Sequence, residues 1–451
     1  MKKYDVIYIG SGHACWHGGI ILKTLGKSVA FVERDLVGGT CTNYGCDAKI
    51  LLDTPIELKE NLDRYKGIGL AQSAELDWEA LMNYKKNVIG FMPGALEGLF
   101  KQFGFDLIKG NAKFLDSHTI DVEGEKYSAD YFVIGTGQTY VPLDIEGKEY
   151  FKDSRDFLSL DKLPNEVTFV GAGIISMEFA SICLSLGRKV NIVDLAEGAL
   201  RQYPKKYVDK IVDKMKAQGA NFYFGRHVAK LEKVGEEEYI LNTNEGDRLA
   251  SNYVLVAVGR RANVDGLNLD SLGIEYSNKG IKVDDHLRTA VKNIYASGDV
   301  IDKNVPKLTP TAEFESNYIA LDIVLPKPLR KKIEYPVIPN IVFTLPRIAQ
   351  VGLSIDEAKK LGFRIEEVDF GKTMTWLNRN NPEEHLTFIF NKKNELEGAA
   401  VFADEAGEFI DLLTLIINQK LTSKELSKMI FSFPTQTYGL VSTLIPLMLK
   451  K

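Results

Sequence analysis

The sequence predicts an α/β fold with two copies of one β-α-β unit and a mixed α+β region behind them. The copies span residues 4–33 and 167–194. Each reads as an apolar strand, a glycine turn, a helix and a second strand that ends in an acid. Matching residues of the two copies lie at one constant offset of 161 positions. From residue 336 onward, apolar runs of both strand and helix period replace this unit, so a third, different domain is expected.

The glycine turn of each copy has the chemistry of a dinucleotide site. Glycine lets backbone amides at the start of the next helix approach a pyrophosphate, and the acid accepts hydrogen bonds from a ribose. The residues are Gly10, Gly12 and Glu33 in the first copy and Gly171, Gly173 and Asp194 in the second. Cys15 and Ser176 stand where the fingerprint has its third glycine, and both are small enough for close packing of helix on strand.

Three further apolar strands end in glycine-containing loops, at residues 131–137, 254–260 and 294–299. Such loops are expected where the edge of a parallel sheet meets a ligand. Asp299, at the end of the last strand, either binds a polyol hydroxyl or only forms a turn with Gly298.

Composition is that of an ordinary globular protein and excludes several partners. The 451 residues predict about two to four domains. A net charge of −5 gives no basis for binding nucleic acid or an anionic membrane. No apolar run reaches the roughly 20 residues that a membrane helix needs. Four cysteines do not make a secreted disulfide framework, so we expect a cytoplasmic protein.

Two of these cysteines, Cys41 and Cys46 in GGTCTNYGC (residues 38–46), form a candidate redox pair. A continuous helix separates residues five positions apart by about 7.5 Å along its axis, which exceeds the usual Cα spacing of a disulfide. The pair therefore closes only where the segment is irregular, and Gly45 supplies that freedom. The alternative is two cysteines buried in a loop.

The C-terminal region has no glycine fingerprint and is expected to make contacts rather than bind a nucleotide. A basic, proline-bearing stretch over 327–335 precedes it as a linker. Strands are predicted near residues 341–343, 386–390 and 397–402, and an amphipathic helix over 408–418.

These motifs resemble those of the FAD-dependent pyridine nucleotide–disulfide oxidoreductases, which include glutathione reductase, dihydrolipoamide dehydrogenase and mercuric reductase. The resemblance covers essentially the whole chain, and GGTCTNYGC is its most specific element. The other matching segments follow in the family's order: GAGIISME at 171–178, IYASGD at 294–299, LTPTA at 308–312 and VFTLPRIAQVG at 342–352.

The resemblance implies two Rossmann-like dinucleotide-binding domains, for FAD and NAD(P), and a C-terminal α+β dimerisation domain. The expected boundaries are 1–150 and 269–332 for the FAD domain, 151–268 for the NAD(P) domain and 333–451 for the dimerisation domain.

Site residues follow from the same resemblance. Those implied for FAD are Gly10, Gly12, Glu33, Thr40, Ala112, Gly137, Asp299 and Ala312. Those implied on the nicotinamide side are Gly171, Gly173, Glu178, Asp194 and Gly259. Cys46 is implied as the thiol beside the flavin and Cys41 as the thiol that attacks substrate. Electrons would then pass from NAD(P)H through FAD to the cysteine pair.

Asp194 also bears on the choice of nucleotide. An acid at the end of this strand suits the 2′-OH of NADH and repels a 2′-phosphate. Leu195 and Ala196 are uncharged, whereas NADP-specific members tend to carry basic residues there. We therefore expect NADH to be favoured.

The C-terminal motif departs from the family pattern. Members that reduce dithiol or disulfide substrates carry a histidine and a glutamate within HPTxxE, and the histidine serves the partner subunit as general acid and base. Phe433 and Tyr438 stand at these positions. Phenylalanine cannot move a proton, and tyrosine has a reference pKa near 10. His385, the last histidine of the chain, precedes a predicted strand and is expected at the surface.

A second departure follows the cysteines. The family reads GCxPxK, but here Ile50 occupies the lysine's position and Lys49 comes one residue earlier. One helix position is about 100° of rotation. Lys49 either meets Glu178, the residue matching the family's partner for that lysine, through a shifted helix, or lies in solvent.

The electron path is thus expected to be intact and the usual proton donor absent. One hypothesis is a homodimeric flavoenzyme that reduces a disulfide or another small-molecule acceptor through Cys41 and Cys46. A second is a diaphorase-like NADH-dependent reductase of quinones, oxygen or metal ions. A third is a redox sensor that reports NADH status to a partner. No resident metal site is expected in any of them.

Overall fold

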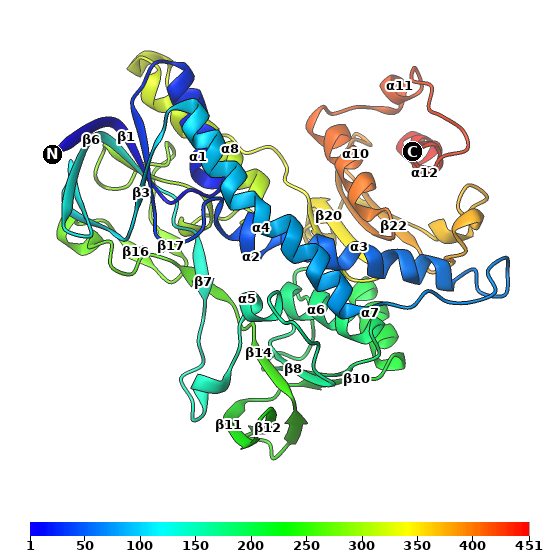
Figure 1. The fold of residues 1–451 in the computed structure, drawn as a ribbon. Helices are drawn as coiled ribbons and strands as arrows, with labels where there is room; N and C mark the ends of the chain where they lie inside the picture. Colours follow the sequence, from blue (N-terminus) through cyan, green and yellow to red (C-terminus); the bar gives the residue numbers. More distant parts are fainter. Residues whose placement is uncertain (451) are drawn as a thin grey trace.

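The computed structural model describes residues 1–450, which form three lobes (Figure 1). The first lobe holds the N-terminus, the second holds the middle of the chain, and the third holds the C-terminus. Two long blue helices run between the lobes and connect them.

The first lobe is built on a seven-stranded sheet. Its strands are β1 (Lys2–Ile9), β2 (Val29–Glu33), β3 (Asp106–Lys109), β4 (Ala112–Asp116), β5 (Thr119–Val122), β6 (Glu125–Ile134) and β18 (Ile294–Ala296). They pair in the order β3-β2-β1-β6-β5-β4, and β18 pairs with β6. The pairs among β1, β2, β3, β6 and β18 are parallel, as expected for buried apolar strands linked by crossovers.

Helices cover this sheet and extend from it. They are α1 (His13–Thr24), α2 (Gly39–Tyr44), α3 (Cys46–Asp63), α4 (Trp78–Phe103) and α8 (Thr309–Val324). α1 and α8 pack closely because Gly18 has no side chain. A Cβ at Gly18 would lie 2.4 Å from the Ser316 carbonyl oxygen, while its backbone amide donates to Ser316 Oγ at 2.9 Å.

The second lobe repeats the same design on a smaller scale. Its parallel sheet has the order β10-β9-β8-β14. The elements are β8 (Glu166–Val170), α6 (Ile174–Ser185), β9 (Lys189–Asp194), α7 (Lys205–Ala217), β10 (Ala220–Phe224) and β14 (Tyr253–Val256). An antiparallel sheet of β11 (Val228–Gly235), β12 (Glu238–Thr243) and β13 (Arg248–Ser251) lies beneath it.

The third lobe is the predicted α+β region. Its antiparallel sheet has the order β19-β20-β23-β22-β21, and α10 packs on it. The elements are β19 (Asn340–Val342), β20 (Arg347–Gly352), α9 (Ile355–Leu361), β21 (Arg364–Val368), β22 (His385–Phe390), β23 (Leu396–Ala403), α10 (Ala406–Asn418), α11 (Ser423–Leu426) and α12 (Gln436–Leu449). The three predicted strands and the predicted helix are confirmed.

Short elements complete the chain. The connection between the first two lobes includes the paired strands β7 (Gln138–Tyr140) and β15 (Arg260–Ala262). The others are α5 (Ser154–Phe157), β16 (Tyr276–Ser277), β17 (Gly280–Ile281) and six 3₁₀ turns at Lys148–Tyr150, Leu269–Leu272, Gly298–Val300, Lys327–Leu329, Phe370–Lys372 and Leu377–Arg379.

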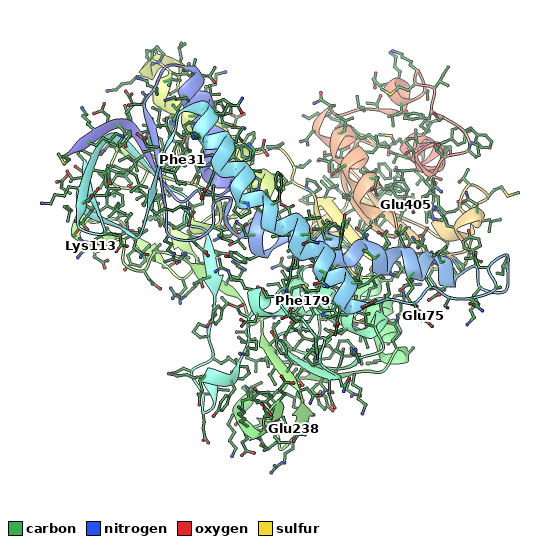
Figure 2. The ribbon with its side chains drawn as sticks, in the orientation of Figure 1. Phe31, Glu75, Lys113, Phe179, Glu238 and Glu405 are labelled. Atoms are coloured by element: carbon green, nitrogen blue, oxygen red, sulfur yellow. The ribbon has the colours of Figure 1, made fainter. Side chains whose placement is uncertain are left out.

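Each lobe has its own apolar core. Figure 2 places Phe31 inside the first lobe and Phe179 inside the second, and both side chains are buried. The cores of the second and third lobes meet at Val342, Ile348 and Phe402, which pack with the second core. Within residues 1–450, none of the helices is both long enough and apolar enough to cross a bilayer.

Leu255 offers a direct test of the second core. Its side chain is fully buried in β14, so Leu255→Ala removes apolar contacts and leaves a cavity. We expect the free energy of unfolding to fall by about 2–5 kcal/mol in urea denaturation. Leu361→Ala, at a leucine that is 52% exposed on α9, is the control and should change it by about 0.5 kcal/mol or less. Equal losses in the two variants would contradict this assignment of the core.

Candidate functional site

One cavity of about 2130 Å³ runs between the lobes and gathers every site residue expected from the sequence. The residues that line it include Gly10, Gly12, Glu33, Thr40, Cys41, Cys46, Ala112, Gly137, Gly171, Gly173, Glu178, Asp194, Gly259, Asp299 and Ala312. The structure thus brings together groups that lie up to three hundred positions apart in the sequence.

The two acids hold their glycine turns in the same way. Glu33 accepts hydrogen bonds from the Ser11 amide at 3.1 Å and the Asp35 amide at 2.9 Å. Asp194 accepts from the Ala172 amide at 2.5 Å and the Ala196 amide at 2.7 Å. These contacts obey the sequence offset of the two copies, so the repeat is structural as well as compositional.

The first glycine of each turn is required by its surroundings. Gly10 has φ +110° and Gly171 has φ +101°, which disfavour any residue with a side chain. A Cβ would also lie 2.6 Å from the Gly135 carbonyl oxygen at Gly10 and 2.4 Å from the Ala257 carbonyl oxygen at Gly171. Each turn is therefore packed against the end of a neighbouring strand, which fixes the start of the next helix.

The redox segment is a helix broken between its two cysteines. α2 ends at Tyr44 and α3 begins at Cys46, while Gly45 lies outside the helical region with φ −142° and ψ −115°. A Cβ at Gly45 would lie 2.9 Å from the Thr40 carbonyl oxygen, so this break needs glycine. The irregularity expected at Gly45 is confirmed, and it is what allows the two thiols to approach one another.

The thiols are electrostatically unequal. A hydrogen bond from the Cys41 thiol lowers the pKa of Cys46 to about 6, against the opposing effect of burial, and Thr309 and Lys49 contribute to the lowering. The same hydrogen bond, with burial, raises the pKa of Cys41 well above its ordinary value. Thr309 Oγ1 lies 3.8 Å from Cys46 Sγ. At neutral pH, Cys46 is thus the thiolate and Cys41 holds the proton.

Lys49 meets Glu178 despite its shift by one residue. Its Nζ lies 3.0 Å from both carboxylate oxygens of Glu178, and Glu178 Oε1 also accepts from the Phe343 amide at 2.8 Å. The Lys49 ammonium lies 3.7 Å from the centre of the Phe343 ring, a cation–π contact. Of the two alternatives left by the sequence, pairing with Glu178 is therefore correct.

The far half of α3 is anchored to the third lobe. Arg347 on β20 lies 2.8 Å from Asp53 Oδ2 and 2.6 Å from Glu57 Oε2, and the side chains of Arg347 and Asp53 are buried. Arg64, just beyond α3, pairs with Asp404 at 2.6 Å. The helix that begins with Cys46 is consequently held at both ends.

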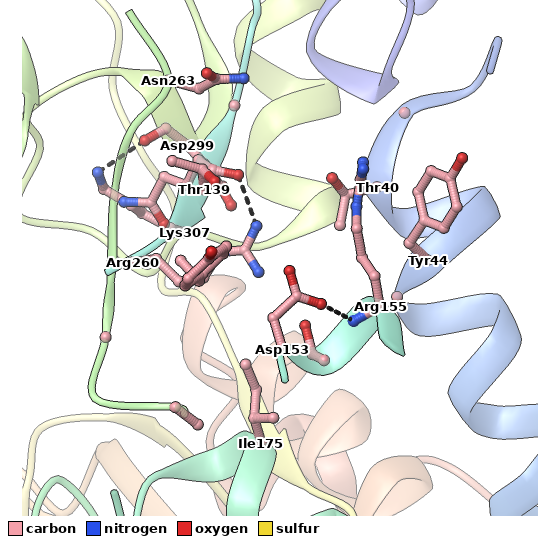
Figure 3. A pocket seen from close by; sticks show the side chains of 18 of the residues that line it. Thr40, Tyr44, Thr139, Asp153, Arg155, Ile175, Arg260, Asn263, Asp299 and Lys307 are labelled. Carbon is pink, nitrogen blue, oxygen red and sulfur yellow. Dashed lines mark hydrogen bonds between the residues drawn. The ribbon is translucent and has the colours of Figure 1, made fainter. Parts of the chain in front are cut away.

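The cavity also contains charged residues that the sequence analysis did not single out. Figure 3 shows Arg260 and Lys307 near Asp299 on one side, and Arg155 beside Tyr44 on the other. Lys307 Nζ donates to the Asp299 carbonyl oxygen at 2.8 Å, and Arg155 stacks 3.9 Å from the centre of the Tyr44 ring. The sequence could have indicated both residues, because each adjoins a motif of the site. Arg260 directly follows Gly259, and Lys307 directly precedes LTPTA.

Two aromatic side chains stand where the family has its C-terminal histidine and glutamate. Phe433 lies just before α12 and Tyr438 in its first turn, with their rings 5.1 Å apart, and Phe433 is 70% exposed in the single chain. The expectation that His385 lies at the surface is wrong. It is the first residue of β22, it is buried, and its Nδ1 lies 2.9 Å from Asp369. Strand pairing on both sides of β22 removes it from solvent.

The cavity fits two dinucleotides. The N-termini of α1 and α6 open onto it after Gly12 and Gly173, and a Cβ added at Gly173, Gly137 or Gly259 would meet nothing within 4 Å. Backbone amides at such helix starts bind pyrophosphate. Thr136 Oγ1 and Arg260 Nε are buried without a hydrogen-bond partner among residues 1–450, so polar donors remain for bound ligands.

Comparison with known proteins identifies the family. Residues 4–316 match the pyridine nucleotide-disulphide oxidoreductases, and residues 338–443 match the dimerisation domain of the same family. The chain belongs to the pyridine nucleotide–disulphide oxidoreductases. It is therefore an FAD-dependent oxidoreductase that uses a pyridine nucleotide, and the match to the dimerisation domain supports a homodimer.

Individual members of this oxidoreductase family resemble the chain along almost its whole length. Mercuric reductase from Lysinibacillus sphaericus is 31% identical, over 97% of this chain and 81% of the relative. Dihydrolipoyl dehydrogenase from Halobacterium salinarum is 29% identical, over 96% of this chain and 93% of the relative. The solved structure of the HOCl-induced flavoprotein disulfide reductase RclA from Escherichia coli superposes with a TM-score of 0.87 over 98% of this chain and 100% of the other, at 24% identity. This last likeness concerns the fold.

The Lys49–Cys46 coupling can be measured in this oxidoreductase. Lys49→Met removes a positive charge that stabilises the thiolate, so the pKa of Cys46 should rise from about 6 by roughly half a unit, which is about 0.7 kcal/mol. The thiolate signal is present above this pKa and lost as the pH falls through it. Ultraviolet thiolate absorbance of the reduced protein measures the midpoint, and Cys15 and Cys183 are silent because burial raises the pKa of each.

Lys59→Met is the matched control, because Lys59 lies on the same helix but pairs with Asp63 at its far end. It should leave the midpoint unchanged. An unchanged midpoint in Lys49→Met, or an equal shift in both variants, would show that Lys49 does not act on Cys46.

Proposed function

We propose that this protein passes electrons from NADH through FAD to a Cys41–Cys46 disulfide and then to a disulfide-type acceptor. The observation that carries the proposal is the unequal thiol pair at the break in the helix. Cys46 is biased toward the thiolate beside Lys49, and Cys41 keeps its proton until it acts as nucleophile.

Bound FAD would supply the redox chemistry that takes a hydride from the nucleotide and delivers an electron pair to the cysteine disulfide. The chain's own residues would do the positioning. Gly10, Gly12 and Glu33 would hold the adenosine and pyrophosphate part of FAD. Lys49, fixed by Glu178, would hold positive charge next to the Cys46 thiolate.

The proposed preference for NADH rests on Asp194. Its carboxylate lies at the end of β9, where the adenosine ribose of a nucleotide on the α6 turn would be found. Arg226 lines the same part of the cavity, but it is paired with Asp247 at 2.8 Å. The Asp194 carboxylate would therefore repel a 2′-phosphate, and Arg226 is already compensated by Asp247.

Reduction of a soft metal ion is a second candidate, favoured by the identity with mercuric reductases. Thiolates are the ligands that soft metal ions prefer. Of the four cysteines, Cys15 and Cys183 are buried, and the sequence has no cysteine after Cys183. Among the cysteines of this chain, Cys41 and Cys46 are therefore the ones that could offer thiolate ligands to such an ion.

Cys41→Ser distinguishes reduction at the cysteine pair from reduction at the flavin. Disulfide reduction should fall by about a thousandfold or more, because the nucleophile is lost. NADH-dependent reduction of a quinone should stay within about threefold, because that path needs only the flavin. Steady-state assays with both acceptors measure this. Cys183→Ala is the control and should keep both activities. If both survived in Cys41→Ser, the pair would not be the electron path.

The nucleotide preference is tested at Asp194. Asp194→Ser removes the negative charge, so the ratio of kcat/KM for NADPH to that for NADH should rise by roughly tenfold, which is about 1.4 kcal/mol. Asp209→Ser, at an exposed position on α7 of the same lobe, should leave the ratio unchanged. A wild-type enzyme that already preferred NADPH would overturn the assignment.

A further inference from the structure

Two histidines at the start of α1 lie beside the redox segment. His13 follows Gly12 directly, and His17 is one helical turn further on. The start of α1 touches the cysteine loop, because a Cβ added at Gly12 would lie 3.7 Å from Gly39 Cα. His13 lines the same cavity as Cys41 and Cys46. The flavin fingerprint needs a helix start here but does not need a histidine.

The two histidines continue into a chain of contacts. His13 Nδ1 lies 3.0 Å from His17 Nε2, and His17 Nδ1 lies 3.5 Å from Glu313 Oε1. The His17 ring is held by stacking on Trp16, with the ring centres 3.6 Å apart. Glu313 is one turn after Thr309 on α8, and Thr309 contacts Cys46. The Glu313 end of this chain of contacts therefore leads back to Cys46 through α8, and the His13 end lies in the cavity that both cysteines line.

One assignment of protons satisfies every contact in this chain. The Glu313 carboxylate lies 3.5 Å from His17 Nδ1 and favours the proton on that nitrogen, and His17 Nε2 then accepts from His13 Nδ1–H. His13 Nε2 is left as an unprotonated base. When it takes up a proton, the positive charge on His13 is stabilised through His17 by the carboxylate, as in other acid–base relays.

We infer that His13 is the proton carrier for the acceptor site and takes the role that Phe433 cannot perform, with His17 and Glu313 as its positioning residues. The inference rests on the proposed function, since it concerns the disulfide acceptor. Phe433 stands at the position of the family's histidine, so the proton must come from elsewhere. Two histidines line the cavity that holds the cysteine pair, His13 and His227, and His227 lies in the second lobe, paired with Glu245 at 2.8 Å.

The proposed step balances in atoms and electrons. Cys41 gives its thiol proton to His13 Nε2 while its sulfur attacks one sulfur of an acceptor RSSR′. The Cys41–SR bond forms, the acceptor's S–S bond breaks, and R′S⁻ takes the proton from His13. The Cys46 thiolate then attacks Cys41 Sγ, forms the Cys41–Cys46 disulfide and releases RS⁻, which takes a proton from solvent. The dithiol loses two electrons and the acceptor gains them.

The charges around His13 agree with this cycle. Burial lowers the pKa of His13, which keeps it neutral and able to accept the Cys41 proton. Asp47 on α3 and Glu313 on α8 act in the opposite direction and favour the protonated ring. Burial also lowers the pKa of His17, and Glu313 opposes this effect. Two carboxylates thus favour the protonated His13 ring, and one of them, Asp47, directly follows Cys46 in the chain.

The test compares two disulfides that differ in their need for a proton donor. His13→Gln should slow reduction of hydroxyethyl disulfide, whose leaving thiol has a high pKa, by about 10²–10⁴-fold. An aromatic nitrobenzoate disulfide releases a stable thiolate that needs no proton, so the rate of its reduction should change by about threefold or less. The rates of hydroxyethyl disulfide reduction by His17→Gln and by Glu313→Gln should lie between those of wild type and His13→Gln. His118→Gln, at an exposed histidine, is the control. Equal losses with both disulfides, or no loss with hydroxyethyl disulfide, would overturn the inference.

A second readout needs no acceptor and separates this inference from the proposed function. In the dithiol-reduced holoenzyme, alkylation of Cys41 by iodoacetamide is followed by mass spectrometry across the pH range. Wild type should show an inflection below the ordinary histidine range, because His13 takes the Cys41 proton and burial lowers the pKa of His13. His13→Gln should lose it. If wild type reduced no disulfide yet showed this inflection, the proposed function would fail and the His13 assignment would stand. If the inflection persisted in His13→Gln, the assignment would fail.

Discussion

Two cysteines five positions apart cannot approach one another within a continuous helix, and the geometry of the site depends on how the chain resolves this conflict. Gly45 interrupts the helix, so α2 carries Cys41 and α3 starts at Cys46. The break brings the Cys41 thiol to Cys46, and its hydrogen bond, with Thr309 and Lys49, favours the Cys46 thiolate. The same break sets the rotation of α3 and hence which lysine reaches Glu178. The approach of the two thiols, their unequal protonation and the position of the Lys49 charge thus all follow from one backbone irregularity.

The frame around this segment comes from repetition. Both nucleotide turns are fixed by a glycine packed against a neighbouring strand and by an acid bonded to the turn's amides. Two helix starts, from different lobes, therefore face one cavity, and both cysteines line it. The third lobe, which matches the family's dimerisation domain, contributes Arg347 and Phe343. Arg347 binds Asp53 of α3, and the Phe343 ring contacts Lys49 of the same helix.

The sequence was sufficient for features that depend on short-range pattern. The two β-α-β units, their acids and the break at Gly45 were all predicted, because each is encoded within about thirty residues. The pairing of Lys49 was left open, since it depends on the rotation of α3 after the break. His385 was misplaced because the sheet on both sides of β22 buries it. The spacing of His13 and His17 was visible in the sequence, but Glu313, which completes the chain of contacts, comes from a distant helix.

The anchoring of α3 has a consequence for how its length can change. Between Cys46 and Glu57 the helix carries three fixed points: the sulfur at its start, Lys49 toward Glu178, and the carboxylates that bind Arg347. Inserting or deleting one residue there would turn everything beyond it by about 100° and shift it by about 1.5 Å, so the sulfur and the carboxylates would fall out of phase. We therefore expect insertions and deletions to be tolerated only beyond Arg64, where α3 has ended. The length of α3 therefore fixes the spacing between the cysteine pair and the third lobe.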